Sequence, residues 1–151
     1  MKTRYFQFWT QLTQGDRYDR RNPIIDHNLN GHAIIFLGSI ANQGWLDIIP
    51  IRFVTFAQME LPIDSDDRVV WRLTQENQMI LLTANRSMKG KDSLEQVMRE
   101  ENTSNSLPVI TVGKADRLMN DSKYRELCVE RLIEIVLNIN AYMGVSPLFT
   151  P

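Results

Sequence analysis

The sequence lacks the features that mark several classes of protein. It contains one cysteine, Cys128, so no intrachain disulfide can form. No apolar run approaches the roughly 20 residues that span a bilayer, and the opening stretch MKTRYFQFWTQLTQ has no continuous apolar core like that of a secretory signal. The formal net charge is -1, which argues against a basic coat for nucleic acid. We therefore expect a cytoplasmic protein in a reducing compartment, with no membrane span.

Several catalytic signatures are also missing. There is no glycine-rich phosphate loop and no G-x-S-x-G nucleophile motif. The two histidines, His27 and His32, lack the spacing of a zinc motif such as H-E-x-x-H. Cys128 lies on the apolar stripe of a predicted helix, which indicates a core residue and not a nucleophile.

The length of 151 residues fits one domain with a substantial core. We divide it into an N-terminal arm, 1–22, and a single domain, 23–151. The arm combines aromatic residues with an excess of basic ones, a composition that can bind single-stranded nucleic acid. It also suits a helix that packs its aromatic side chains on the core, and we favour that interpretation because a short aromatic-rich arm usually needs burial to be ordered.

Apolar segments and helical periodicities alternate along the domain. We expect strands at 24–25, 51–56, 79–82 and 108–112, and helices at 32–43, from 67 onward, at 93–101 and at 124–143. The second helix should bury Val69, Val70 and Leu73, and Gly144 should end the last one. The short strands are apolar on both faces, as strands covered on both sides must be. This pattern predicts an α/β sandwich with a mainly parallel sheet of four or five strands.

Polar side chains follow the strands at the edge where such sheets bind ligands. Asp26 comes directly after Ile24-Ile25, and the stretch Thr83-Ala84-Asn85-Arg86 closes a later strand. Asp64, Asp66 and Asp67 precede a helix. Carboxylates that converge from separate elements repel one another, and a Mg²⁺ or Mn²⁺ ion would relieve that repulsion. A simpler reading is that Asp66 and Asp67 only interact with the positive end of the helix dipole, with Ser65 or Asp66 as the N-cap, and that Asn85 only shapes a turn.

The motifs IIDHNL and DRVVWRLTQENQMILLTANR, with a helix and Gly44 between them, resemble the PIN-like domain superfamily, and most closely its small bacterial branch. The resemblance covers residues 23–113. It implies a three-layer α/β/α sandwich with a central parallel sheet. It also implies a metal-dependent ribonuclease, in which three or four acidic residues gather Mg²⁺ or Mn²⁺.

The resemblance assigns site residues one by one. Asp26 is similar to the acid of the first strand, and Asp67 to the acid at the start of a helix, with Asp66 as a competitor. Asn85 stands where nuclease members usually have an aspartate, and Asp92 could be a fourth acid. The implied catalytic group is Asp26, Asp67 and Asn85, and the implied metal ligands are these three with Asp92.

Asn85 separates two functional hypotheses. A neutral amide can ligate a hard cation but attracts it less than a carboxylate does. The chain is then either a nuclease whose basic loop, Arg86, Lys89 and Lys91, binds RNA, or a PIN-like domain that has lost catalysis and binds protein or RNA. A third hypothesis is an unrelated flavodoxin-like domain in which the acids are caps. The resemblance also suggests a homodimer, with spare apolar surface at Ile133, Leu137 and Tyr142.

Overall fold

The structure is a computed structural model that describes residues 22–84 and 93–151. Apart from Asn22, the predicted N-terminal arm lies outside these residues. Among the helices of the described segments, none has the length and apolar character needed to cross a membrane.

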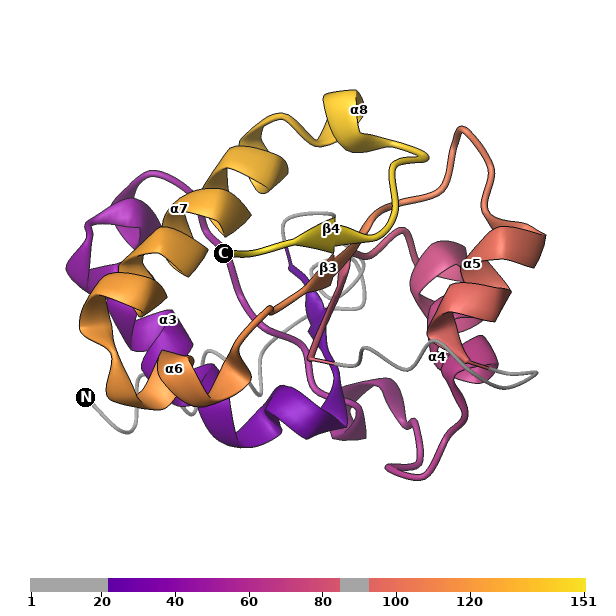
Figure 1. Ribbon diagram of the computed structural model, residues 1–151, viewed down its shortest axis with the longest axis horizontal. Helices are drawn as coiled ribbons and strands as arrows, with labels where there is room; N and C mark the ends of the chain where they lie inside the picture. Colours follow the sequence, from indigo (N-terminus) through magenta and orange to yellow (C-terminus); the bar gives the residue numbers. More distant parts are fainter. Residues whose placement is uncertain (1–21, 85–92) are drawn as a thin grey trace.

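Four short parallel strands form the central sheet. They are β1 (Ile24–Ile25), β2 (Leu81–Thr83), β3 (Val109–Thr111) and β4 (Leu148–Phe149), arranged in that order. The pairings Ile25 with Leu82, Leu82 with Ile110, and Ile110 with Leu148 fix the register. Figure 1 shows the strands between the helices, with β4 beside β3.

A fifth segment touches the free side of β1. Val54 forms an isolated parallel bridge with Ile24, and its carbonyl accepts the Ile25 N–H at 2.7 Å. Across the sheet, the order is therefore the segment at Val54, then β1, β2, β3 and β4. The segment that is second in the sequence thus lies outside the first. Flavodoxin-like domains share this order, and its switch point lies between the first and third segments, here β1 and β2.

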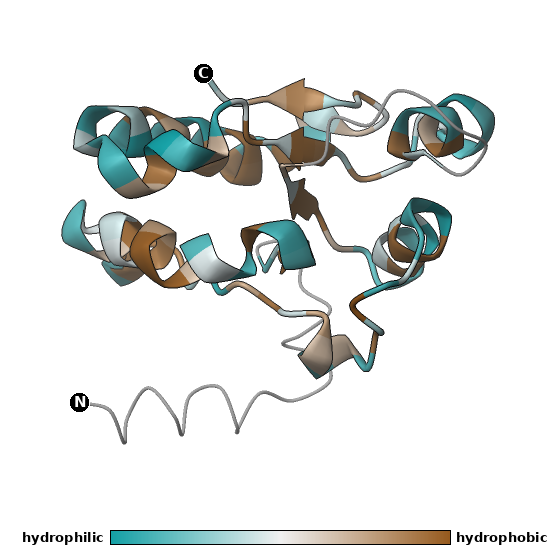
Figure 2. Ribbon diagram, turned by 60° about the horizontal axis from the view of Figure 1, so that its bottom comes forward, coloured by the Kyte–Doolittle hydropathy of each residue, from teal (hydrophilic) through white to brown (hydrophobic). Residues whose placement is uncertain are grey.

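Six α-helices in the described residues cover the sheet. They are α3 (Ala33–Asn42), α4 (Asp67–Glu76), α5 (Leu94–Glu101), α6 (Ala115–Asn120), α7 (Ser122–Leu137) and α8 (Ile139–Tyr142). Short 3-10 turns occur at η1 (His27–His32), η2 (Trp45–Asp47) and η3 (Ala57–Met59). Helices α3, α6 and α7 lie on one side of the sheet, and α4 and α5 lie on the other (Figure 2).

Neighbouring residues of each strand face opposite cores. Ile25, Leu82 and Ile110 pack with α3, α6 and α7. Ile24, Leu81 and Val109 pack with α4 and α5. Because successive strand side chains point to opposite faces, strands that are apolar throughout can supply both cores. The three-layer α/β/α sandwich with a parallel sheet is confirmed.

The predicted strand 51–56 is wrong as a strand, since only Val54 bridges to the sheet. Its apolar residues are buried, as Ile51 and Phe53 join one core and Val54 and Phe56 the other. The backbone donors between them bond to side chains instead of a neighbouring strand. Arg52 N–H donates to the Asn22 amide oxygen, and Thr55 N–H to that of Gln58. The apolar pattern of residues 51–56 therefore indicated that their side chains are buried, and not that their backbone pairs with a neighbouring strand.

The last paired strand was not predicted, and neither was α6. The long helix expected over 124–143 begins instead at Ser122, where Asp121 caps it, and breaks at Asn138. The Asn138 side chain donates to the Glu134 carbonyl, so it competes with the backbone for the helical bond.

Two predicted faces also need correction. Val69 is 47% exposed, whereas Val70 is buried as predicted and Leu73 packs partly buried against the core. Helix α4 also buries Trp71 and Thr74, so its buried face is turned away from Val69. Ile133 is core, and the Tyr142 hydroxyl bonds to Glu134, so of the three residues offered as spare apolar surface only Leu137 is an exposed aliphatic side chain. Cys128 is fully buried, as predicted, and burial raises the pKa of its thiol.

Candidate functional site

The ends of β1 and β2 bring together polar residues that are distant in the sequence. Ile25 pairs with Leu82, so Asp26 and Thr83 are the next residues of adjacent parallel strands. The Asp26 N–H donates to the Leu82 carbonyl at 2.8 Å, which extends the ladder to the residue that carries the carboxylate. This position is the switch point of the sheet, where open α/β folds bind their ligands.

Hydrogen bonds fix the Asp26 carboxylate. The Thr83 hydroxyl donates to Asp26 Oδ2 at 2.7 Å and accepts a longer bond, 3.4 Å, from the Asn28 amide nitrogen. The Asn28 amide oxygen in turn accepts the Ala84 N–H at 3.2 Å. The chain from Ala84 to Asp26 thus uses both ends of the Asn28 amide.

The second oxygen of Asp26 is available to a ligand. Within the described residues this oxygen has no hydrogen-bond partner, and the side chain is half-buried. Thr83 is fully buried, so its hydroxyl is held in place by the strand around it. A carboxylate with one oxygen oriented by a donor and one left open suits a hard cation.

The two acids before α4 have different surroundings. Asp66 is the N-cap, and its carboxylate accepts the Val69 N–H at 2.9 Å, as one of the sequence readings predicts. Asp67 is half-buried and reaches across to the next helix, where its Oδ2 accepts the Leu94 N–H at 3.0 Å. Because α4 leads into β2 and α5 follows it, both helix starts lie at the carboxyl edge of the sheet. Asp67 and Asp26 therefore share that edge.

Ion pairs fasten α4 to α5. Glu101 accepts bonds from Arg72 at 2.8 Å and from Arg68 at 2.5 Å, and Arg68 also pairs with Glu100. The hydrogen bond from Arg72, followed by that from Arg68, lowers the pKa of the Glu101 carboxyl. These pairs are partly exposed, so each adds little stability alone, but together they link α4 to the end of α5, where Glu100 and Glu101 lie.

The other predicted site residues lie outside the described part of the chain. They are Asn85, Asp92, Arg86, Lys89 and Lys91. In residues 22–84 and 93–151, no cluster of three or more His, Cys, Asp or Glu side chains could hold a metal ion. The described residues contribute Asp26 and Asp67 to the carboxyl edge.

Comparisons of the chain with protein-family models, curated proteins and solved structures find no match. A function for this chain is therefore inferred from its own residues.

The sequence placed Thr83 at the end of a strand and Asn28 within the motif IIDHNL but indicated no role for either residue. Their role comes from a contact between residues 57 positions apart, which only the register of β1 and β2 creates. The available signal was a hydroxyl residue at the end of an apolar strand, opposite an acid at the end of another.

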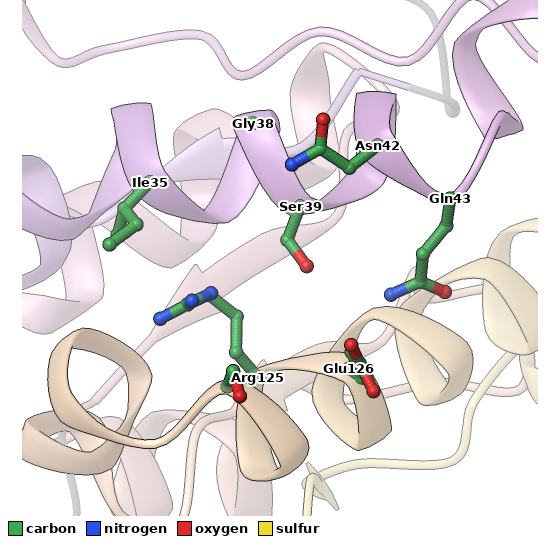
Figure 3. A pocket seen from close by; sticks show the side chains of 8 residues that line it. Ile35, Gly38, Ser39, Asn42, Gln43, Arg125 and Glu126 are labelled. Carbon is green, nitrogen blue, oxygen red and sulfur yellow. The ribbon is translucent and has the colours of Figure 1, made fainter.

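A separate groove lies between α3 and α7 (Figure 3). It has a volume of about 370 Å³, and polar and apolar surface contribute about equally to its lining by Ile35, Gly38, Ser39, Asn42, Gln43, Ser122, Arg125 and Glu126. Arg125 already donates to the Leu118 carbonyl at 2.6 Å. The groove shares no residue with the cluster around Asp26, so it is not part of the candidate site.

Proposed function

We propose that the carboxyl edge around Asp26 is the site of a metal-dependent ribonuclease of PIN-like type. The observation that carries the proposal is the Asp26 carboxylate at the switch point, with one oxygen bonded to Thr83 and the other open. Asp67, at the start of α4, supplies a second carboxylate to the same edge. Oxygen ligands of this kind suit Mg²⁺ or Mn²⁺.

The chemistry divides between the ion and the chain. Mg²⁺ or Mn²⁺ held by Asp26 and Asp67 would activate a water molecule and stabilise the leaving oxygen of an RNA phosphodiester. Thr83 and Asn28 keep the Asp26 carboxylate in one orientation, so it needs little reorganisation to bind a cation. Asn85 and Asp92 complete the proposed ligand set, and the loop with Arg86, Lys89 and Lys91 would contact the RNA backbone.

The strand order alone also suits the flavodoxin-like hypothesis, but the first loop does not favour it. The residues after β1 are Asp26-His27-Asn28, and the sequence has no glycine-rich loop to cradle a phosphate. A carboxylate at that point repels a phosphate unless a cation lies between them. The nuclease hypothesis supplies that cation.

The test is cleavage of single-stranded RNA by the full chain with Mn²⁺. Asp26→Asn removes the charge but keeps an oxygen that can accept the Thr83 hydroxyl, so the fold should survive. We expect cleavage to fall by on the order of 100-fold or more. Asp47→Asn is the matched control, because Asp47 is exposed in η2 after the far end of α3. It should cleave like the wild type.

Cleavage that is equal in wild type and Asp26→Asn would overturn the proposed site. Mn²⁺ should also raise the melting temperature of the wild type and not that of Asp26→Asn. A wild type that binds Mn²⁺ and RNA but leaves the RNA intact would instead support the interaction-module hypothesis.

A further inference from the structure

We propose that Lys114 binds an RNA phosphate at the same edge of the sheet. This inference rests on the proposed function and adds a substrate contact outside the basic loop 86–91. Lys114 follows β3 in the stretch Val112-Gly113-Lys114-Ala115.

The sheet places Lys114 and Asp26 on opposite sides of the end of β2. The Val112 N–H donates to the Thr83 carbonyl at 2.8 Å, so the chain leaving β3 runs beside the residue that orients Asp26. Helix α6 starts directly after Lys114, and it packs against η1, which starts directly after Asp26. The two residues therefore directly precede two elements that contact each other, and η1 also contacts β2.

One side chain of α7 and one of the C-terminal segment hold the backbone at Lys114. The Gly113 N–H donates to the Thr150 hydroxyl at 3.0 Å, and the Lys114 N–H donates to the Tyr124 hydroxyl at 2.8 Å. The Tyr124 hydroxyl itself donates to the Pro151 carbonyl. The Lys114 carbonyl accepts the Arg117 N–H at 2.9 Å. Both backbone groups of Lys114 are thus satisfied inside the fold, and only its side chain extends outward.

The charge of Lys114 has no acidic partner within the described residues, and its side chain is exposed. The nearby arginines already have partners within the fold. Arg117 pairs with Asp121 at 2.5 Å and lies over the Tyr124 ring at 4.7 Å, and Arg125 donates to the Leu118 carbonyl. Lys114 therefore brings an uncompensated positive charge to the edge that carries Asp26 and Asp67.

A phosphodiester is the ligand class that fits this arrangement. A lysine ammonium is a compact point charge with three donors, and it binds phosphate oxygens without a fixed geometry. Two carboxylates at this edge repel an RNA backbone, so a cation across β2 would offset that repulsion and help to hold the strand.

The test measures binding apart from catalysis. A labelled single-stranded RNA is titrated with the full chain in EDTA at several salt concentrations, for the wild type, Lys114→Met, Lys114→Arg and Lys123→Met. We expect Lys114→Met to weaken binding about 5-fold and to reduce the slope of log affinity against log salt by about 0.7. Lys114→Arg should keep most of the affinity. Lys123→Met, an exposed lysine on α7, should match the wild type.

Equal affinity of Lys114→Met and Lys123→Met would overturn the inference, as would a wild type that does not bind RNA. The proposed nuclease activity fails separately, if wild type and Asp26→Asn behave alike with Mn²⁺. A Lys114-dependent affinity without cleavage would keep the phosphate contact and reject only the catalysis.

Discussion

The Thr83 hydroxyl donates a hydrogen bond of 2.7 Å to the Asp26 carboxylate, between residues 57 positions apart. The contact exists because β1 and β2 are neighbouring parallel strands in a register that ends both at the same level. It converts two separate strand ends into one candidate site.

Removing the Thr83 hydroxyl should show how much the orientation of the Asp26 carboxylate contributes to activity, because the charge of that carboxylate stays. Thr83→Val is nearly isosteric and leaves Asp26 without its donor, so we expect a loss of about 10-fold in Mn²⁺-dependent cleavage. The free energy of unfolding should fall by about 1 to 2 kcal/mol. Thr83→Ser keeps the hydroxyl and should retain most of the activity, whereas equal losses in both variants would mean that packing and not the hydrogen bond matters.

The two aspartates before α4 should behave differently. Asp66→Ala removes the N-cap bond to Val69, so urea denaturation should show a loss of about 1 kcal/mol, with cleavage unchanged. Asp67→Asn keeps an oxygen for the Leu94 N–H but loses the charge proposed to bind metal. Its cleavage should fall by on the order of 100-fold. The reverse pattern would make Asp66 the site acid.

Gly144 and Gly38 form a matched pair for backbone effects. Gly144 has a φ of +78°, and a Cβ there would lie 2.9 Å from Ser104 Cα. Gly144→Ala should therefore cost about 1 to 3 kcal/mol of stability. Gly38 lies inside α3, and a Cβ would meet nothing within 4 Å, so Gly38→Ala should raise stability by up to about 1 kcal/mol. Thermal melts of both variants check the prediction, and a stabilised Gly144→Ala would contradict it.

The link between α4 and α5 should depend on pH. The arginines that bond to Glu101 lower its folded pKa, so its stabilising contribution is present above the unfolded pKa of about 4.3 and is lost as pH falls through the folded value. Glu101→Gln should be less stable than the wild type at pH 7, and the difference should shrink at pH 3. Glu130→Gln, on an exposed position of α7, is the control. A difference that stays constant with pH would show that charge on Glu101 contributes nothing.

The sequence predicted the parallel sheet because its strands carry consecutive apolar residues. Ile24-Ile25 and Leu81-Leu82 each divide between two cores, and only a sheet with helices on both faces buries such pairs. It could not predict that Val54 alone would bridge to β1, because side-chain acceptors at Asn22 and Gln58 take the neighbouring backbone donors. The sequence also did not predict β4, because a strand of two residues is too short to show a pattern of apolar residues.

The sequence by itself determined the layered fold class and the location of Asp26 at the end of a buried strand, because these depend on local periodicity and on neighbouring residues. Only the tertiary structure decided that Thr83 and Asn28 orient Asp26, that Asp67 contacts the start of α5, and that the chain leading from β3 to Lys114 runs beside Thr83. These relationships depend on strand order and register, which are set by long-range packing and leave no periodic signal in the chain.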